Sequence, residues 1–229
     1  MILAIDFSIN SPGLSFLKDG KLKFASLTKK GVCPQDFYQT LEEHQVRTIM
    51  MEKYKKVKNN SLDSRGFTLD AIATANGIIE LIEKIYPNTK KSKDNILIIE
   101  GFSFGSKGNR LAQTAGYQYI LRYLLIERFF PIENLYLYPP QTIKSKAGAA
   151  KRGEGKKGMI ERFIEHDKQI GNLSDTVFYQ EMKKDEDSSF RAKGNKRKPV
   201  GNWRKPIDDI VDSYWILYTY FIVNEIPIP

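Results

Sequence analysis

The sequence predicts one α/β domain, in which helices flank a mixed five-stranded sheet. Short apolar segments separated by turn residues open the chain, and later apolar segments alternate with helical ones. Strands joined by short turns form an antiparallel meander, whereas strands joined through helices usually lie parallel. The 229 residues are enough for a single domain with a substantial core.

The first three strands are predicted from the opening of the chain. Residues 1–8 (MILAIDFS) form an apolar run that ends in an acid, and residues 13–17 form a second apolar run after a turn cluster. The tetrapeptide at 18–21 (KDGK) predicts a tight hairpin into a third strand at 22–27. These strands form the antiparallel meander.

The rest of the chain supplies two more strands and the helices. The strands are predicted at 96–100 and 135–138. Helices are predicted at about 36–58, 69–86, 110–130, 157–167 and 206–223, and proline at position 206 suits a first helical turn. Residues 172–205 are polar and irregular, and we expect an exposed loop there.

The chain is strongly basic, which indicates a polyanionic partner. It has 36 Lys and Arg residues against 27 Asp and Glu, a net charge of +9 and an isoelectric point near 9.4. Nucleic acid is favoured over a membrane because no basic amphipathic helix stands out. A basic but unspecialised surface is the alternative.

Other bulk features indicate the compartment. The sequence contains no apolar stretch that could span a bilayer and no signal peptide. The single cysteine, Cys33, excludes an intramolecular disulfide, and two histidines make a zinc site implausible. We therefore expect a reducing cytoplasm.

Acidic residues at the ends of three predicted elements are the main candidate for chemistry. Asp6 and Glu100 each end an apolar strand, and Asp208, Asp209 and Asp212 begin the last helix. Positions 209 and 212 share one helix face, and 208 and 212 form a second possible pair. Converging carboxylates repel one another unless a cation neutralises them, and Mg²⁺ or Mn²⁺ takes such oxygen ligands.

Each acid also has a plain structural explanation. Asp6 could cap a turn, and Asp208 and Asp209 could be favoured by the helix dipole alone. Glu100 follows four aliphatic residues, where an unpaired carboxylate is costly, and Asp212 precedes an apolar run. Taken together with the basic charge, the acids indicate phosphodiester hydrolysis with two metal ions.

Four blocks of the sequence resemble the RuvC-like Holliday junction resolvases, and they occur in that family's order. The blocks are IDFS at 5–8 with SPGLS at 11–15, IIEGFSF at 98–104 with NRLAQTAG at 109–116, PPQTIK at 139–144 with GKKGM at 155–159, and DDIVDS at 208–213. Segments 36–58 and 172–205 look like insertions, which indicates a divergent member of a bacteriophage type.

The resemblance implies an RNase H-like fold and a homodimeric endonuclease of DNA recombination and repair. It implies that Asp6, Glu100, Asp209 and Asp212 bind two Mg²⁺ or Mn²⁺ ions, with Asp208 left open as a ligand. The implied substrate is branched DNA, namely the four-way junction. A broader nuclease of flaps and forks, and a non-catalytic module that binds branched DNA, remain alternatives.

Several basic and aromatic residues are candidates for contact with DNA. The resemblance assigns Lys144 and either Lys156 or Lys157 to the scissile phosphate. Glycine-rich basic segments and aromatic side chains extend this set, although charge runs are often only solvated. The further DNA candidates are Lys146, Lys151, Arg152, Lys196, Arg197, Lys198, Phe102, Phe104, Lys107 and Arg110, with Phe190 and Trp203 as residues that could stack on bases.

The helix at 110–130 is the expected dimer surface. Its apolar and aromatic residues exceed what one sheet face needs, and they are Tyr117, Tyr119, Leu121, Tyr123, Leu124 and Leu125.

Overall fold

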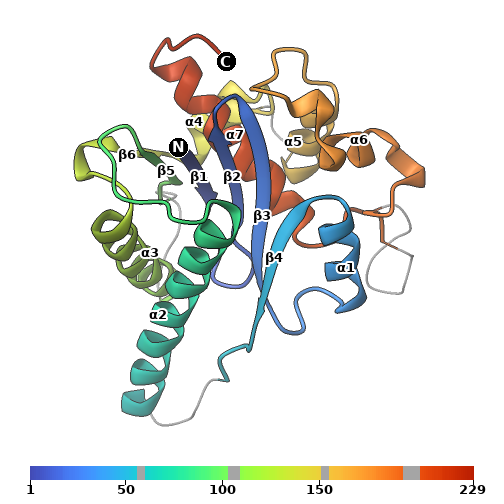
Figure 1. Cartoon of the computed structure of the whole chain (residues 1–229). Helices are drawn as coiled ribbons and strands as arrows, with labels where there is room; N and C mark the ends of the chain where they lie inside the picture. The colour runs from blue at the N-terminus through green and yellow to red at the C-terminus, as the bar shows by residue number, and fades with distance from the viewer. Residues whose placement is uncertain (56–59, 103–108, 151–154, 193–201) are drawn as a thin grey trace.

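One six-stranded mixed sheet organises the chain (Figure 1). The computed structural model describes residues 1–55, 60–102, 109–150, 155–192 and 202–229. The strand order is β4-β3-β2-β1-β5-β6. The strands are β1 (Ile2–Asp6), β2 (Gly13–Lys18), β3 (Lys21–Lys29), β4 (Val46–Met51), β5 (Ile96–Glu100) and β6 (Leu135–Tyr138).

The predicted meander and the two later strands are confirmed. Strands β1, β2 and β3 pair antiparallel, whereas β5 pairs parallel with β1 and with β6. Asp19 and Gly20 turn the β2–β3 hairpin with φ values of 52° and 69°, as a two-residue turn with left-handed backbone requires. The sheet therefore has the arrangement expected of the RNase H-like fold, extended by one strand.

The additional strand corrects the prediction of five strands and of one helix over 36–58. Helix α1 covers only Asp36–Glu43, and the chain then forms β4, which pairs parallel with β3 at the sheet edge. Only Val46 is fully buried in β4. Since an edge strand has no continuous apolar face, its six residues carry no clear alternation, and pairing with β3 decides their conformation.

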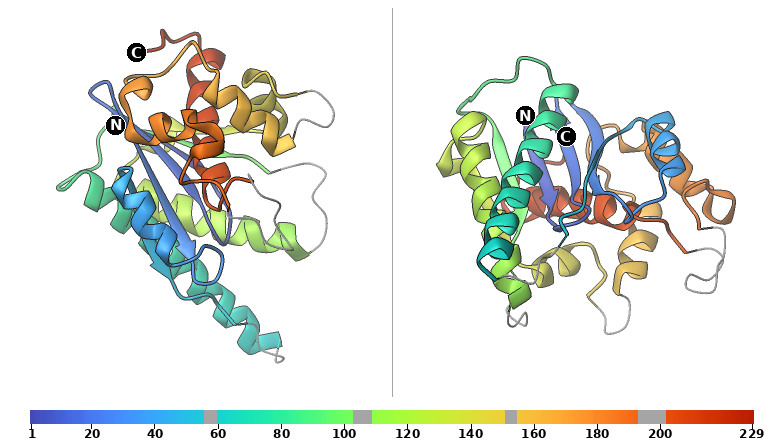
Figure 2. Two further views of the ribbon diagram at one scale, coloured as in Figure 1. Left: turned by 90° about the vertical axis from the view of Figure 1, so that its right-hand side faces the viewer. Right: turned by 90° about the horizontal axis from the view of Figure 1, so that it is seen from below.

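Helices cover both faces of the sheet (Figures 1 and 2). The longer ones are α2 (Asn60–Ile85), α3 (Asn109–Arg128), α5 (Gly155–Ile164) and α7 (Ile207–Val223), and the shorter ones are α4 (Pro140–Lys146) and α6 (Val177–Lys183). Helices α2 and α3 pack on one face, and α7 packs on the other with α4, α5 and α6. No helix in the described residues is both long and apolar enough to cross a membrane.

The strands divide their side chains between two hydrophobic cores. Leu3 and Ile5 join the core beneath α2 and α3, whereas Ala4 joins the core beneath α7. On β5, Leu97 and Ile99 face α2 and α3, while Ile98 faces α7. Successive strand residues point to opposite faces, so this register decides which face receives the acid at each strand end.

The segment 172–205 is more ordered than the exposed loop that the sequence predicts. It contains short 3-10 turns at Leu173–Asp175 and Asp185–Asp187, with α6 between them. Its Phe190 is fully buried, with its ring centroid 5.5 Å from that of Phe178 and 6.0 Å from that of Phe37 on α1. The two predicted insertions thus pack against each other.

A buried carboxylate joins these two segments. Glu181 on α6 lies 3.1 Å from the imidazole of His44 and 2.6 Å from the Lys184 ammonium. It also accepts hydrogen bonds from the backbone and hydroxyl of Ser189. Burial alone would raise the pKa of Glu181, but these donors outweigh burial and lower it to about 2.

The substitution Glu181→Gln is expected to lower the free energy of unfolding by on the order of 2 kcal/mol at pH 7, because charged hydrogen bonds are lost. The folded-state pKa lies below the ordinary value, so this stabilisation is present above about pH 4.5 and is lost as the pH falls toward 2. Denaturant unfolding of both proteins across this range measures it. Glu186→Gln, at an exposed neighbour, is the control, and equal stabilities at pH 7 would contradict the expectation.

Candidate active site

Asp6 and Glu100 meet at the carboxyl ends of two adjacent parallel strands. Ile5 pairs with Ile99 in the β1–β5 register, so the next residues of both strands are neighbours. Side-chain alternation turns both carboxylates toward α7, on the same face as Ala4 and Ile98. The two carboxyl groups are close enough that each shifts the pKa of the other. Asp6 is only 8% exposed.

The first turns of α7 bring the other acids to the same place. Asp209 is 2% exposed and accepts a hydrogen bond from the Ser11 hydroxyl at 2.6 Å. Asp212 lies one turn further along, and its charge acts on Asp6, as that of Asp209 does. Asp208 is half-buried, and its charge is not among the main influences on the pKa of Asp6 or of Glu100. The structure thus groups Asp209 and Asp212 with the strand acids.

Close backbone contact between β2 and α7 holds this arrangement. A Cβ atom at Gly13 would lie 2.0 Å from the backbone oxygen of Asp209 and 2.5 Å from the backbone nitrogen of Ile210. Only glycine permits this approach. One turn along, the hydroxyls of Ser15 and Ser213 are hydrogen-bonded at 2.7 Å. The glycine in the SPGLS block therefore sets the height of α7 above the sheet.

Two lysines supply positive charge at α7. The Lys156 ammonium lies 2.5 Å from Asp208, 3.2 Å from Asp209 and 3.9 Å from Asp212. The Lys205 ammonium donates to both carboxylate oxygens of Asp209 at 2.7 Å and lies 2.8 Å from Asp208. Burial would lower the pKa of Lys156, but the carboxylates outweigh burial and raise it. The same lysines hold the pKa of Asp208 below its ordinary value despite burial.

The remaining carboxylates are not fully neutralised. Burial raises the pKa of Asp6 well above its ordinary value, and the charges of Asp212, Glu100 and Asp209 raise it further. Burial also raises the pKa of Glu100, although Asp6, Lys144 and Lys156 offset part of the effect. Burial and the charges of Asp209, Asp208 and Glu100 bring the pKa of Asp212 to about 7. The centre therefore favours an additional cation.

The side chains do not form a closed metal site as they stand. Across the described parts of the chain, no three His, Cys, Asp or Glu side chains are grouped so that they could hold an ion. The acidic groups whose charges act on Asp6 are nevertheless carboxylates, and carboxylate oxygens are the ligand type of Mg²⁺ and Mn²⁺.

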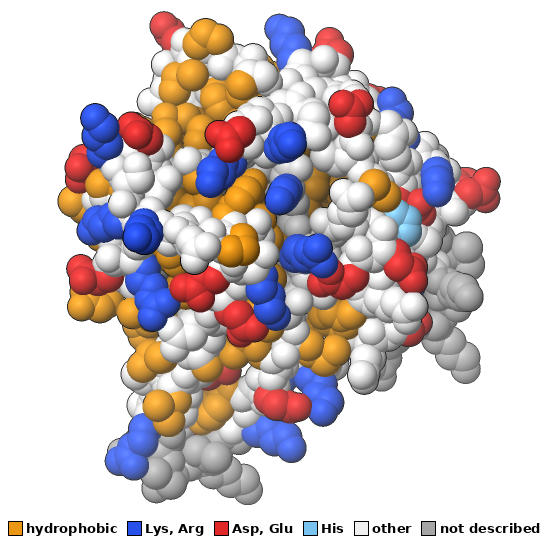
Figure 3. All heavy atoms as spheres, viewed as in Figure 1, with side chains coloured by type: hydrophobic (Ala, Val, Ile, Leu, Met, Phe, Trp, Pro, Cys, Tyr) orange, Lys and Arg blue, Asp and Glu red, His pale blue; other side chains and the backbone are white. Residues whose placement is uncertain are grey.

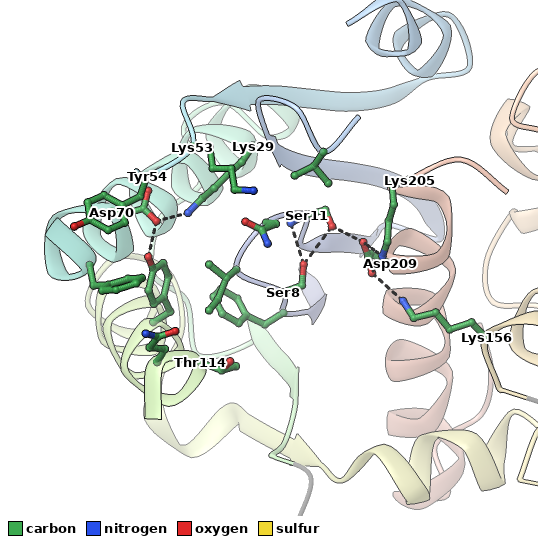
Figure 4. A pocket seen from close by; sticks show the side chains of 17 residues that line it. Ser8, Ser11, Lys29, Lys53, Tyr54, Asp70, Thr114, Lys156, Lys205 and Asp209 are labelled. Carbon is green, nitrogen blue, oxygen red and sulfur yellow. Dashed lines mark hydrogen bonds and ion pairs between the residues drawn. The ribbon is translucent and has the colours of Figure 1, made fainter. Parts of the chain in front are cut away.

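A cleft of about 810 Å³ opens beside the acids (Figure 4). Asp209, Lys156 and Lys205 lie at one end, and Lys29, Lys53, Tyr54 and Asp70 lie at the other, with Ser8 and Ser11 between them. The cleft curves around the carboxyl edge of the sheet, since its walls include residues from both faces. It can hold an extended ligand next to the acidic centre.

The structure distinguishes among the predicted basic residues. Lys156 contacts the acids, whereas Lys157 is 85% exposed and pairs with Glu161 at 3.5 Å. Lys144 is exposed at the end of α4 and acts electrostatically on Glu100. Lys146 is exposed on the same turn.

Two of the predicted stacking residues are already engaged in the protein. Phe190 is buried among phenylalanines and cannot stack on a base, which corrects that prediction. The Arg191 guanidinium covers the Trp203 ring at 3.7 Å. Half-buried Phe102 lies 6.3 Å from Tyr119, with Arg122 over its ring at 5.4 Å. The predicted contacts outside the described residues are Phe104, Lys107, Lys151, Arg152, Lys196, Arg197, Lys198 and the side chain of Arg110.

Several residues of the cleft were not predicted from the sequence, and three of them carry charges that pair within it. Lys205 is four residues before Asp209, and this helical spacing is a detectable signal. Lys29 and Asp70 form an ion pair between β3 and α2. Both charges occupy otherwise core-facing positions, since Leu27 and Ala71 beside them are buried in the core beneath α2. A lysine on the apolar face of β3 and an aspartate on the apolar face of α2 are a signal in the sequence from which this ion pair could have been predicted.

The surface view does not show one large basic patch. On the face in Figure 3, basic and acidic side chains are interspersed. On α3, Tyr117, Leu121 and Leu125 are buried in the core, whereas Tyr119 and Tyr123 are 62% and 63% exposed. Of the expected dimer surface, these two tyrosines remain accessible.

Comparison with known proteins finds likeness only among solved structures. No family model and no curated protein sequence matches the chain. A Thermus thermophilus RuvC structure is similar with a TM-score of 0.41 and 11% identity, covering 97% of this chain and 96% of that one. T. thermophilus RuvC in complex with Holliday junction substrate has a TM-score of 0.43 and 12% identity, covering 100% and 98%. Likeness at this level concerns the fold alone.

The substitution Gly13→Ala is expected to displace α7, because both clashing groups belong to the backbone. The cost in unfolding free energy should be about 1–3 kcal/mol, as for other overpacked sites. Denaturant unfolding measures it. Gly116→Ala is the matched control, since a Cβ there meets no atom within 4 Å. Equal stabilities for wild type and Gly13→Ala would contradict the expected contact.

The substitution Asp212→Asn is expected to stabilise the metal-free protein at pH 8 by on the order of 2 kcal/mol, because it removes a repelled charge. The folded-state pKa of about 7 lies above the ordinary value of 3.8, so ionisation costs stability as the pH rises between these values. The advantage of the variant should therefore grow from pH 4 to about 7 and then level off. Thermal or denaturant unfolding in EDTA measures it.

Asp208→Asn provides a control of opposite sign, because Asp208 is paired with Lys156 and Lys205. That variant should be less stable than wild type at pH 8. A destabilised Asp212→Asn variant at pH 8 would show that the Asp212 charge is compensated.

Proposed function

We propose that the protein is a metal-dependent endonuclease that hydrolyses phosphodiester bonds in branched DNA, with the four-way junction as its principal substrate. One observation supports the proposal: Asp6, Glu100, Asp209 and Asp212, from two strands and one helix, lie within electrostatic range of one another. The pKa values of Asp6, Glu100 and Asp212 are raised there. Clustered carboxylates of this kind weaken binding of a polyanion unless they hold cations, which favours catalysis over binding alone.

The donors fit hard divalent ions, and we propose two Mg²⁺ or Mn²⁺ ions at each site. Asp6, Glu100 and Asp212 would hold the ions, and Asp209 would help to position the attacking water. Bound ions would supply Lewis acidity at the phosphate and a more acidic water. In the structure, Lys156 and Lys205 form ion pairs with the carboxylate of Asp209 on α7. These ammonium groups would have to move away from the acids when ions bind.

A lysine that moves away from the acids can then contact the DNA backbone. Lys156 is 58% exposed and lies on the wall of the cleft, where its ammonium can reach a phosphate oxygen. Lys144 acts on Glu100 from α4 and would hold the same DNA strand. In this proposal the acids orient the reaction while these lysines hold the charged backbone.

A homodimer is part of the proposal, because two opposed strands of a four-way junction need two active sites. The exposed Tyr119 and Tyr123 on α3 support this surface as the contact. Half-buried Phe102, next to Tyr119, would then lie near the junction centre.

The test is cleavage of a labelled four-way junction, flap, fork and linear duplex in Mg²⁺ and in Mn²⁺. Asp6→Asn should reduce junction cleavage by at least about 100-fold, because it removes a charge that the reaction centre depends on. Asp94→Asn, at an exposed acid away from the cleft, is the matched control.

Each pattern of cleavage has a distinct meaning. Paired nicks in the junction that vanish in Asp6→Asn support a resolvase. Equal cleavage of flaps and forks would support a metal-dependent nuclease, but one that accepts a wider range of branched DNA. Tight junction binding without cleavage in either metal would overturn the enzyme and leave a module that binds branched DNA.

A further inference from the structure

The end of the cleft opposite the acidic centre has a chemistry of its own (Figure 4). Lys29 from β3 forms a close ion pair with Asp70 from α2. The Tyr117 hydroxyl from α3 donates to the same carboxylate at 2.5 Å, and the Lys29 ammonium lies 5.2 Å from the centre of the Tyr117 ring. One polar group of three side chains therefore joins three elements at the wall of the cleft.

Stability alone does not explain this group. The side chains of Lys29 and Asp70 are 1% and 9% exposed, so both charges lose most of their hydration. A buried ion pair of this kind commonly contributes no more to the free energy of unfolding than apolar residues of the same size would. Burial lowers the pKa of Lys29, and the contact with Asp70 only partly offsets that effect. All three residues line the cleft, so their contacts hold this part of its wall in place.

Aromatic rings form the walls beside this polar group. Phe7 lies 6.5 Å from Tyr117, and Tyr54 lies 4.9 Å from Phe67, and all four rings border the cleft. The Tyr54 ring rests directly on α2 at Gly66, where a Cβ would lie 2.3 Å from it.

Amide and hydroxyl side chains complete the wall. Asn10 comes from the β1–β2 loop, and Gln113 and Thr114 come from α3. Together with the carboxylate of Asp70, they offer both hydrogen-bond donors and acceptors.

This combination suits a nucleobase better than a phosphate. A phosphate site needs cations that are not neutralised, but at this end of the cleft Asp70 neutralises Lys29. Aromatic faces with amide and carboxylate groups are the means by which proteins hold unstacked bases. Lys53 is exposed at the rim and can contact the phosphate of the same nucleotide.

We propose that this end of the cleft is a binding pocket for one unpaired nucleobase of the DNA strand that enters the active site. The inference rests on the proposed function, because it assigns the pocket to a nucleotide adjoining the cleaved bond. The pocket selects DNA in which a base is already unpaired, as at a branch point, since extruding a paired base costs free energy.

The experiment measures binding without catalysis, by saturation-transfer NMR of the protein in EDTA. The probes are the four deoxynucleoside monophosphates at millimolar concentration, with 2-deoxyribose 5-phosphate as the probe that lacks a base. At least one nucleotide should bind about tenfold more tightly than the sugar phosphate, because stacking and base contacts are lost without the base.

Two variants test whether binding occurs in this pocket. Gln113→Ala and Tyr54→Ala should each weaken nucleotide binding about tenfold and leave the weak sugar phosphate binding unchanged. Lys53→Met should weaken binding of both probes, whereas Lys21→Met, at the exposed hairpin on the far end of β3, should change neither. Far-ultraviolet circular dichroism establishes that each variant is folded.

Three outcomes would overturn the pocket: no binding of any nucleotide, equal binding of the sugar phosphate, or nucleotide binding that is unchanged in both Gln113→Ala and Tyr54→Ala. These outcomes are separate from the cleavage test. Nucleotide binding that depends on Gln113 and Tyr54, in a protein that cuts no DNA, would retain the pocket and reject the nuclease. Cleavage without such binding would retain the nuclease and reject the pocket.

Discussion

The contact between β2 and the first turn of α7 is the constraint on which the candidate site depends. Gly13 allows the strand to touch the backbone of Asp209, and the Ser11 hydroxyl holds the carboxylate of that residue. Because most of α7 is buried, its side chains cannot adjust independently of this contact. The sheet places Asp6 and Glu100, and the height and rotation of one helix decide whether the other acids meet them.

This geometry concentrates negative charge where little water remains, and the structure offsets that charge unevenly. Lys156 and Lys205 pair with Asp208 and Asp209, so the pKa of Asp208 is lowered, whereas the pKa values of Asp6 and Asp212 are raised. The acidic centre therefore contains two kinds of carboxylate, those paired with lysines and those that are not. The paired acids are satisfied by the protein itself, and the others gain from a further cation.

The two segments that the sequence predicts as insertions line the cleft as well as packing against each other. Segment 36–58 adds β4 to the sheet edge and places Lys53 and Tyr54 on the wall of the cleft. Segment 172–205 packs on α1 through Phe190 and Glu181, and its end supplies Lys205 to the acids. Both segments thus shape the space beside the acidic centre, at opposite ends of one cleft.

The sequence alone determined the local features: the hairpin at Asp19, the buried strands ending in Asp6 and Glu100, and the start of α7 after Pro206. Turn residues, apolar runs and helix starts act over a few neighbours, so they are visible in the chain. Tertiary structure decided the edge strand β4, the choice of Lys156 over Lys157, and the Lys29–Asp70 pair. Each of these depends on contact between residues far apart in the chain, and a single sequence carries no record of such pairing.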